Sequence, residues 1–387
     1  MDFSLSEDQE LFRGTLKKYL NHVGRTDVAR EFIKGNTTVA EEVSAGLAEL
    51  GSTAIPVSEP YDGLGLGPLD LIPFFEETGR ALVPGVHVET LALAVPLLEK
   101  YGTEAQKEKY LPEIASGSIT ATLAWLEAGK SYDPDGITCR AQQDGDDFII
   151  DGVKTLVPCG DVFLALVRTA EGSKGEGLSL ILIEQVEGVS MRKLNVLDET
   201  QHVVELTLNQ VKVPQSQVVG AVGDGWNILQ DGLLSFNAAL SSSMVGAMDE
   251  IVSMAAEYAK IRIQFNQPIG RFQAIKHRIV NMKLDLETAR SLSYYANWAV
   301  ENQTDDRKAA VHSARSFNTE AFIRLASDNI QIHGGIGFTE EIDCHLFLKR
   351  ARYYQNYLGS VRKSRGHIAE GLDWSAKKSE RDVVSIG

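Results

Sequence analysis

The chain has 387 residues, 43% of them hydrophobic and 24% charged, which suits a folded protein of two or three packed units. A net charge of −15 without a basic stripe argues against a nucleic-acid partner, but it permits a polyanionic ligand in a local basic pocket. No apolar run approaches the ~20 residues that span a bilayer, and the acidic start is unlike a signal peptide. The sequence therefore favours a cytoplasmic protein without membrane contact. Its three scattered cysteines predict neither a metal site nor a disulfide.

Residues 1–118 carry a helical pattern and are predicted to form a first, helical domain. Ser6 and Gln9 have the spacing of a capping box, and Leu16 and Leu20 follow at helical spacing. The glycine-rich stretch at 62–67 is predicted to be a loop, since no strand precedes it as a dinucleotide fingerprint would require. Pro68 is predicted to begin the next helix.

Residues 119–215 are predicted to form a middle β domain, either a barrel or a sandwich. Short apolar or alternating runs at 148–152, 162–167, 178–183 and 203–208 are separated by turns rich in Gly and Asp. The helical period then returns, which predicts a C-terminal helical bundle at 216–372 and a loose tail at 373–387.

Several blocks in this order resemble the acyl-CoA dehydrogenase family over nearly the whole chain. They are Gly63-Leu64-Gly65, the segment 76–80 (EETGR), the segment 262–277 (RIQFNQPIGRFQAIKH) and the segment 331–352, which begins QIHGGIGF. The resemblance implies an α+β fold with an N-terminal helical domain, a middle β-barrel or sandwich domain and a C-terminal four-helix bundle. It also implies an FAD cofactor, an acyl-CoA substrate, an electron-transfer flavoprotein or similar acceptor, and a homo- or hetero-tetramer.

In this family FAD lies between two subunits, and the resemblance assigns one half of that site here. The residues expected to bind the cofactor are Arg262, Phe265, Phe272, Gln273, Gln331, Gly334, Gly335 and Ser360. An arginine fork suits a pyrophosphate, and glycines permit close approach of the backbone. The alternative interpretation is a surface arginine and a pair of glycines that ends a helix.

The half of the site that faces the flavin ring departs from the family pattern. Leu126 stands where a hydroxyl is usual, and Leu156 replaces a tryptophan that walls the ring. Pro158 replaces a threonine and lacks a backbone N–H donor. This chain's own β domain is therefore not expected to hold the flavin ring as family members do.

The two positions at which family members carry the catalytic glutamate are also changed. Leu358, in the segment Tyr357-Leu358-Gly359, stands at the usual position, and Phe236 stands at the alternative one. Leu234 and Asn237 replace an aspartate and an arginine that hold the CoA chain. Since neither leucine nor phenylalanine accepts a proton, no catalytic residue is predicted.

Three hypotheses follow. The first is a non-catalytic subunit of a heteromeric acyl-CoA dehydrogenase, which lends its cofactor-binding half to a paralogous partner. The second is an active homo-oligomer with a relocated base, for which Glu340, Glu341 and Asp343 are the nearest candidates in sequence. The third is another flavin reaction, such as that of an oxidase or monooxygenase, on the same fold.

Overall fold

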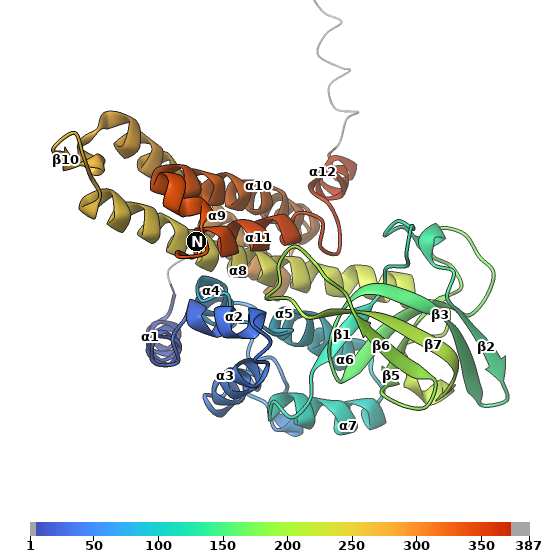
Figure 1. Ribbon diagram of the computed structural model, residues 1–387. Coiled ribbons are helices and arrows are strands. Elements are labelled where there is room, and N and C mark those ends of the chain that lie inside the picture. Colours follow the sequence, from blue (N-terminus) through green and yellow to red (C-terminus); the bar gives the residue numbers. More distant parts are fainter. Residues whose placement is uncertain (1–4, 373–387) are drawn as a thin grey trace, which may run out of the picture.

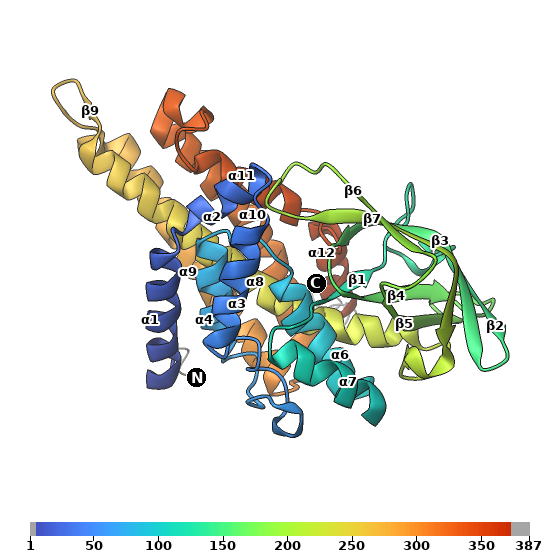
Figure 2. The ribbon, with the colours of Figure 1, turned by 60° about the horizontal axis from the view of Figure 1, so that its bottom comes forward.

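The computed structural model describes residues 5–372, so the tail predicted at 373–387 lies outside the described residues. Three parts are visible in Figures 1 and 2: a helical N-terminal part, a sheet in the middle and a long helical bundle. This arrangement confirms the predicted α+β fold. One apolar core joins the N-terminal helices to the bundle, and a second lies within the sheet.

The N-terminal part is made of short helices. They are α1 (Glu7–His22), α2 (Thr26–Ile33), α3 (Thr38–Glu49), η1 (Glu59–Tyr61), α4 (Ile72–Arg80), α5 (His87–Glu89), the π-helix η2 (Thr90–Ala94), α6 (Val95–Tyr101) and α7 (Glu104–Ala115). The predicted capping box is confirmed, because the Gln9 backbone N–H donates to Ser6 Oγ at 3.2 Å and the Ser6 N–H donates to Gln9 Oε1 at 3.0 Å.

The predicted helix start at Pro68 is wrong, since α4 begins at Ile72. Asp70 accounts for the difference. Its carboxylate accepts the Gly67 backbone N–H at 3.2 Å and the Gln9 side-chain amide at 2.9 Å, and these bonds hold residues 67–70 in a turn.

The middle part forms one eight-stranded sheet, whose strands run in the order β6-β7-β3-β2-β4-β5-β8, with β1 paired to β4. The strands are β1 (Ala121–Ala124), β2 (Arg140–Asp144), β3 (Asp147–Pro158), β4 (Val162–Arg168), β5 (Leu178–Glu184), β6 (Val189–Lys193), β7 (Val203–Pro214) and β8 (Val218–Val219), with η3 (Pro134–Gly136) and η4 (Gln215–Gln217) between them. All four predicted runs lie in strands. A buried ion pair of Glu127 with Lys154, at 2.8 Å, ties the loop after β1 to β3.

The C-terminal part is built on three long helices and two shorter ones. They are α8 (Gly225–Ile261), α9 (Gln273–Glu301), α10 (Arg307–His333), α11 (Cys344–Tyr354) and α12 (Val361–Glu370). The hairpin β9 (Ile263–Gln264) and β10 (Gln267–Pro268) with η5 (Ile269–Arg271) joins α8 to α9, and η6 (Gly334–Phe338) follows α10. With 37 residues, α8 is about 55 Å long. It runs from beside the sheet to the hairpin at the far end of the bundle (Figures 1 and 2).

The segment 76–80, part of the family resemblance, joins the N-terminal part to the bundle. Buried Glu76 accepts hydrogen bonds from Arg13 of α1 at 2.8 Å and from Arg290 of α9 at 3.0 Å. The backbones of α4 and α8 also approach closely, because a Cβ at Gly246 would lie 1.8 Å from the Glu76 carbonyl oxygen. Only glycine allows this approach.

Within residues 5–372, no helix combines the length and the apolar character that crossing a membrane requires.

Candidate functional site

Most of the predicted cofactor-binding residues gather at one end of the bundle. Arg262, Phe265 and Phe272 lie in the turn between α8 and α9, and Gln273 is the first residue of α9. Gln331, Gly334 and Gly335 lie where α10 ends. Because α8, α9 and α10 run antiparallel in succession, these ends meet at the hairpin, far from the chain's own sheet (Figures 1 and 2).

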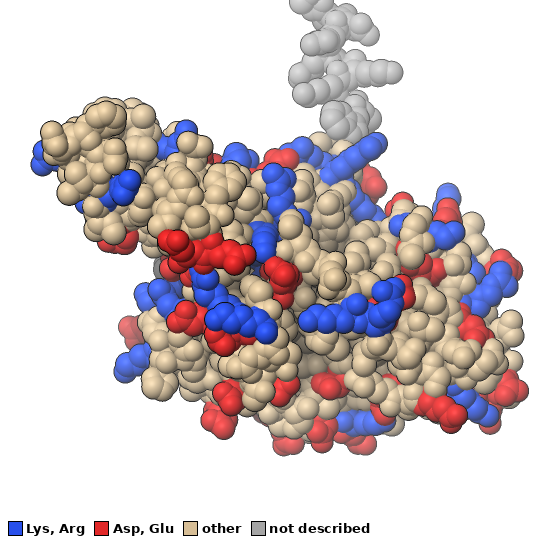
Figure 3. Space-filling view, in the orientation of Figure 1, with Lys and Arg blue, Asp and Glu red and all other residues tan. Residues whose placement is uncertain are grey.

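Direct contacts bring this end together. The Tyr258 ring of α8 stacks on His333 of α10 with ring centroids 4.2 Å apart, and its hydroxyl donates to the His333 carbonyl oxygen at 3.3 Å. The Phe265 ring, whose residue is 85% exposed, lies edge-on to Phe272 at 5.9 Å. The exposed Arg262 side chain makes no hydrogen bond or ion pair with any other described residue. Figure 3 shows that the hairpin end is mostly uncharged, with a few basic side chains.

The two glycines after α10 leave the backbone open. Gly334 ends the helix with φ of 64°, a conformation that favours glycine, so the capping interpretation holds for this residue. A Cβ at Gly334 or Gly335 would meet no atom of this chain within 4 Å. Packing within the described chain therefore does not explain the second glycine, whereas close approach by another molecule would. The residues at this end suit the pyrophosphate side of a flavin nucleotide.

Ser360, the eighth predicted cofactor-binding residue, lies apart from the others. It is the N-cap of α12, and its hydroxyl accepts the Lys363 backbone N–H at 3.3 Å. This serine stands beside Leu358, at the other end of the bundle.

The positions that would face a flavin ring offer no polar side chain. Leu126 uses its carbonyl oxygen to accept the Thr155 N–H at 2.8 Å, and the Pro158 carbonyl oxygen accepts the Thr122 hydroxyl at 2.9 Å. Leu156 is 39% exposed and has a positive φ of 52°. This half of the site therefore suits the isoalloxazine poorly, in contrast to the hairpin end.

The two positions of the usual base come together around one tyrosine. Leu358 is buried, and the neighbouring Tyr357 packs edge-on against Phe236 with ring centroids 5.8 Å apart. The Tyr357 hydroxyl donates to Glu89, a buried carboxyl group of α5. Arg315 of α10 donates to the carbonyl oxygens of Tyr354 at 2.7 Å and Tyr357 at 2.9 Å, which fixes the loop that carries Leu358.

A cavity of only about 30 Å³ adjoins Leu358. It is lined by Trp125, Gln230, Leu233, Leu234, Asn237, His312, Arg315, Leu358, Gly359, Ser360, Lys363, Ser364 and His367, none of which is a carboxylate. The Trp125 ring forms one side of the cavity. Its centroid lies 4.8 Å from that of Tyr132 and 5.8 Å from that of Trp226, so the ring is held in place by packing. Both base positions are therefore apolar, and little space is left between the sheet and the bundle.

None of the relocated-base candidates lies beside Leu358. Asp343 accepts hydrogen bonds from Arg30 and Thr26 of α2, each at 2.6 Å, while Glu340 and Glu341 are exposed in the same turn. That turn precedes α11 and Leu358 follows it, so the 11 residues of the helix separate them by about 16 Å.

Glu89 is a buried acid that the sequence analysis did not single out. Burial raises its pKa despite the Tyr357 hydrogen bond and the nearby charge of Arg350. It lines a separate cavity of about 20 Å³ with Arg350 and Tyr354, not the cavity at Leu358. No periodic pattern could have found it, because α5 has only three residues.

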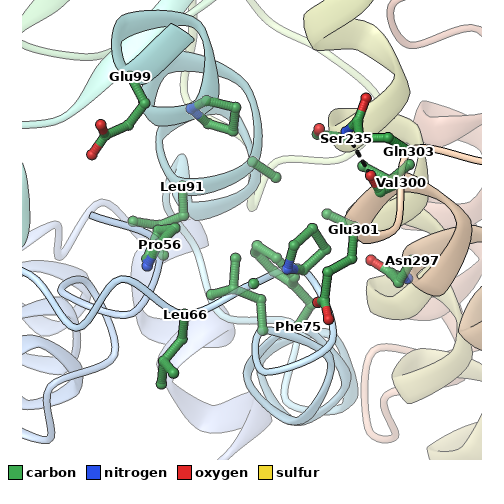
Figure 4. Close-up of a pocket in the computed structure, with 16 residues that line it drawn as sticks. Pro56, Leu66, Phe75, Leu91, Glu99, Ser235, Asn297, Val300, Glu301 and Gln303 are labelled. Carbon is green, nitrogen blue, oxygen red and sulfur yellow. Dashed lines mark hydrogen bonds between the residues drawn. The ribbon is translucent and has the colours of Figure 1, made fainter. Parts of the chain in front are cut away.

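A larger cavity, of about 340 Å³, lies between α4, η2, α8 and α9 (Figure 4). Leu71, Phe75 and Leu91 make much of its wall apolar. Its acids are engaged elsewhere: Glu301 accepts the Leu69 N–H at 3.0 Å and Glu99 accepts the Ser58 N–H at 2.8 Å. It shares no lining residue with the cavity at Leu358.

Family models identify the class of protein that this fold and site define. Residues 6–118 match the acyl-CoA dehydrogenase N-terminal domain, and residues 223–372 match the acyl-CoA dehydrogenase C-terminal domain. The chain belongs to the acyl-CoA dehydrogenase family of flavoproteins.

Individual relatives are distant but matched over most of their length. A 3-(aryl)acrylate reductase of Clostridium sporogenes is 28% identical over 345 residues, which cover 86% of this chain and 90% of the relative. The crystal structure of an acyl-CoA dehydrogenase from Geobacillus kaustophilus has a TM-score of 0.89 at 25% identity, covering 95% of this chain and 99% of that one. A structure described as PigA with FAD and proline has a TM-score of 0.87 at 26% identity, and the match covers 96% of this chain and 98% of that one.

Proposed function

We propose that this chain is the non-catalytic subunit of a heteromeric acyl-CoA dehydrogenase. Its hairpin end, which carries Arg262, Phe265 and Gly335, would contact FAD held by a paralogous partner. The partner would supply the base and an intact β-domain pocket for the flavin ring. When bound, FAD supplies the hydride acceptor of this reaction class. The electrons removed from the substrate would then pass to an electron-transfer flavoprotein or similar acceptor.

The observation that carries the proposal is the cavity at Leu358. An acyl thioester needs a carboxylate within hydrogen-bond reach of its α-carbon and room for the thioester itself. The cavity of about 30 Å³ has no carboxylate in its wall and is closed by Trp125. Losing the base alone typically costs ~10²–10⁴ in rate.

The hairpin end supports the other half of the proposal. Arg262, Phe265 and the open backbone at Gly335 are presented to solvent rather than to this chain's own sheet. A cofactor that contacts them must therefore be held mainly by another subunit. The proposed tetramer would pair this chain with its paralogue.

Purification alone and with the paralogue tests the proposal. Alone, the chain should contain little flavin and should not reduce an electron acceptor with any acyl-CoA. Co-expressed with a paralogue that carries glutamate at the position of Leu358, it should co-purify as a complex whose flavin is proportional to the partner chain. A yellow, active preparation of the chain alone would refute the proposal and favour a relocated base.

The Leu358→Glu variant sharpens this test. The isolated variant should remain inactive toward acyl-CoA, because Leu234, Asn237 and Pro158 are also unsuited to the substrate and flavin. Activity of the variant alone would mean that the acyl-CoA and flavin sites are intact. Rapid air oxidation of flavin reduced by NAD(P)H would instead support the oxidase or monooxygenase alternative.

A further inference from the structure

Buried polar atoms without a hydrogen-bond partner concentrate around the cavity at Leu358. Ten such side-chain atoms occur within residues 5–372. Four of them belong to side chains that line this one cavity: Trp125 Nε1, Gln230 Nε2, His312 Nδ1 and Arg315 Nη1. Since buried polar groups are normally paired, such a concentration indicates that a partner is missing from the cavity.

Three of these atoms can only donate a hydrogen bond. An indole N–H, an amide NH₂ and a guanidinium NH₂ have no lone pair to offer, whereas the histidine nitrogen can donate or accept. A water molecule brings two hydrogens of its own and satisfies such donors incompletely. A group that only accepts, such as an ionised carboxylate, matches them.

The electrostatics of the cavity favour an anion as well. Arg315 is 2% exposed, and its guanidinium donates to two carbonyl oxygens rather than to a carboxylate. Burial lowers the pKa of Arg315 to about 10, so the guanidinium stays charged at neutral pH. The Lys363 ammonium, 5.6 Å from the centre of the Trp125 ring, pairs with Asp133 at 3.3 Å, whereas the lining contains no acidic residue to balance the charge of Arg315. A buried charge without a counter-ion is costly.

The size of the cavity limits the anion. A volume of about 30 Å³ corresponds to about two water-sized groups, because one water needs about 10–15 Å³ by this measure. Two oxygens on one carbon occupy that space. We propose that the cavity binds a small monocarboxylate, the size of formate or acetate, with its oxygens on Arg315 Nη1, Gln230 Nε2 and Trp125 Nε1.

The residue at 358 decides whether the cavity is free. A glutamate there would add a carboxylate of the chain's own to the wall that contains Arg315, whereas Leu358 leaves the donors to an external acid. The inference goes beyond the proposed function, since it concerns the isolated chain and holds whether or not a partner supplies the base.

Titration of the full-length chain with ¹³C-labelled formate tests the site. Line broadening of the formate carbon resonance is followed at constant ionic strength, with sodium chloride as the replacing salt. Formate binding should be saturable and should be lost in Leu358→Glu. Trp125→Phe and Gln230→Leu, which each remove one donor, should weaken binding about tenfold. Trp298→Phe, a matched change in α9 outside the cavity, should leave it unaltered.

Several results would overturn the assignment. Absence of saturable formate binding to the wild-type chain would mean that the cavity holds water alone. Equal competition by chloride would assign a monatomic anion instead of a carboxylate. Wild-type affinity in both Trp125→Phe and Gln230→Leu would place any bound formate elsewhere, even if Leu358→Glu fails to fold.

Discussion

The change at position 358 goes beyond the loss of one side chain. Leu358 has a φ of 50°, a left-handed conformation that costs a residue with a Cβ about 1–2 kcal/mol. Arg315 holds this conformation through the carbonyl oxygens of Tyr354 and Tyr357. Since these hydrogen bonds are made to backbone atoms, a different side chain at position 358 would leave them in place. The leucine is therefore explained by what the cavity must hold rather than by the backbone.

Glu89 gives a pH-dependent prediction at the same loop. Burial raises the pKa of its carboxyl group above the ordinary value of 4.5, so the folded protein binds this proton more tightly than the unfolded chain does. The stabilisation that comes from this tighter proton binding is fully present below pH 4.5 and is lost as the pH rises through the raised pKa of Glu89. Glu89→Gln, which cannot ionise, should therefore gain stability relative to wild type as the pH rises.

Urea unfolding at pH 4.5, 6 and 8 measures this effect, with the free energy of unfolding of the two proteins compared at each pH. Glu113→Gln, an exposed change in α7, serves as the control and should leave the difference constant. A stability difference between Glu89→Gln and wild type that stays constant, or that moves in favour of wild type with rising pH, would contradict a raised pKa of the Glu89 carboxyl group.

At the scale of elements, α11 connects the bundle to the loop between β6 and β7. Arg350 donates to the Asp198 carboxylate and, at 2.6 Å, to the Thr200 hydroxyl. The side chains of Arg350 and Asp198 are both almost completely buried. Next along the helix, Lys349 pairs with Glu199 at 2.8 Å on the surface. Two adjacent ion pairs thus join the same two segments and differ mainly in burial.

Arg350→Met should destabilise the protein by about 3–5 kcal/mol, because it leaves the buried Asp198 carboxylate without its partner. Lys349→Met should cost less than about 1 kcal/mol, as exposed pairs do. Urea unfolding of both variants measures the contrast. Equal losses of unfolding free energy in the two variants would mean that the buried pair stabilises the protein no more than the exposed pair does.

Comparing the observed helices and strands with the sequence shows which of them a residue pattern could predict. β3, β4, β5 and β7 were predictable because each has a run of apolar or alternating residues, and the α1 capping box was predictable from Ser6 and Gln9. β2 and β6 are mostly exposed and polar, and so lack such a run. Pro68 suited a helix start by local preference, but the bond from Gln9 to Asp70 joins segments that only folding brings together. Glu89 and Arg315 were missed for the same reason, since their partners are distant in sequence.

At the scale of the whole molecule, the length of the bundle separates the two halves of the proposed cofactor site. The hairpin between α8 and α9 and the sheet lie at opposite ends of the molecule (Figures 1 and 2). One chain therefore cannot bring its own Arg262 to a flavin on its own sheet. Under the proposed function, use of both halves would require a second subunit, which would couple assembly to cofactor binding.

Arg262→Met tests this coupling in the complex with the paralogue. The side chain is exposed and makes no hydrogen bond or ion pair with described residues that the change would break, so the variant's own free energy of unfolding should change by less than about 0.5 kcal/mol. Flavin retention should fall by about tenfold or more, since a hydrogen-bonded charge contributes about 1.5–3 kcal/mol. The matched control Arg362→Met removes an exposed arginine of α12 and should leave flavin content unchanged. Flavin absorbance per complex after gel filtration measures both, and wild-type flavin retention in Arg262→Met would show that the hairpin end does not reach the partner's cofactor.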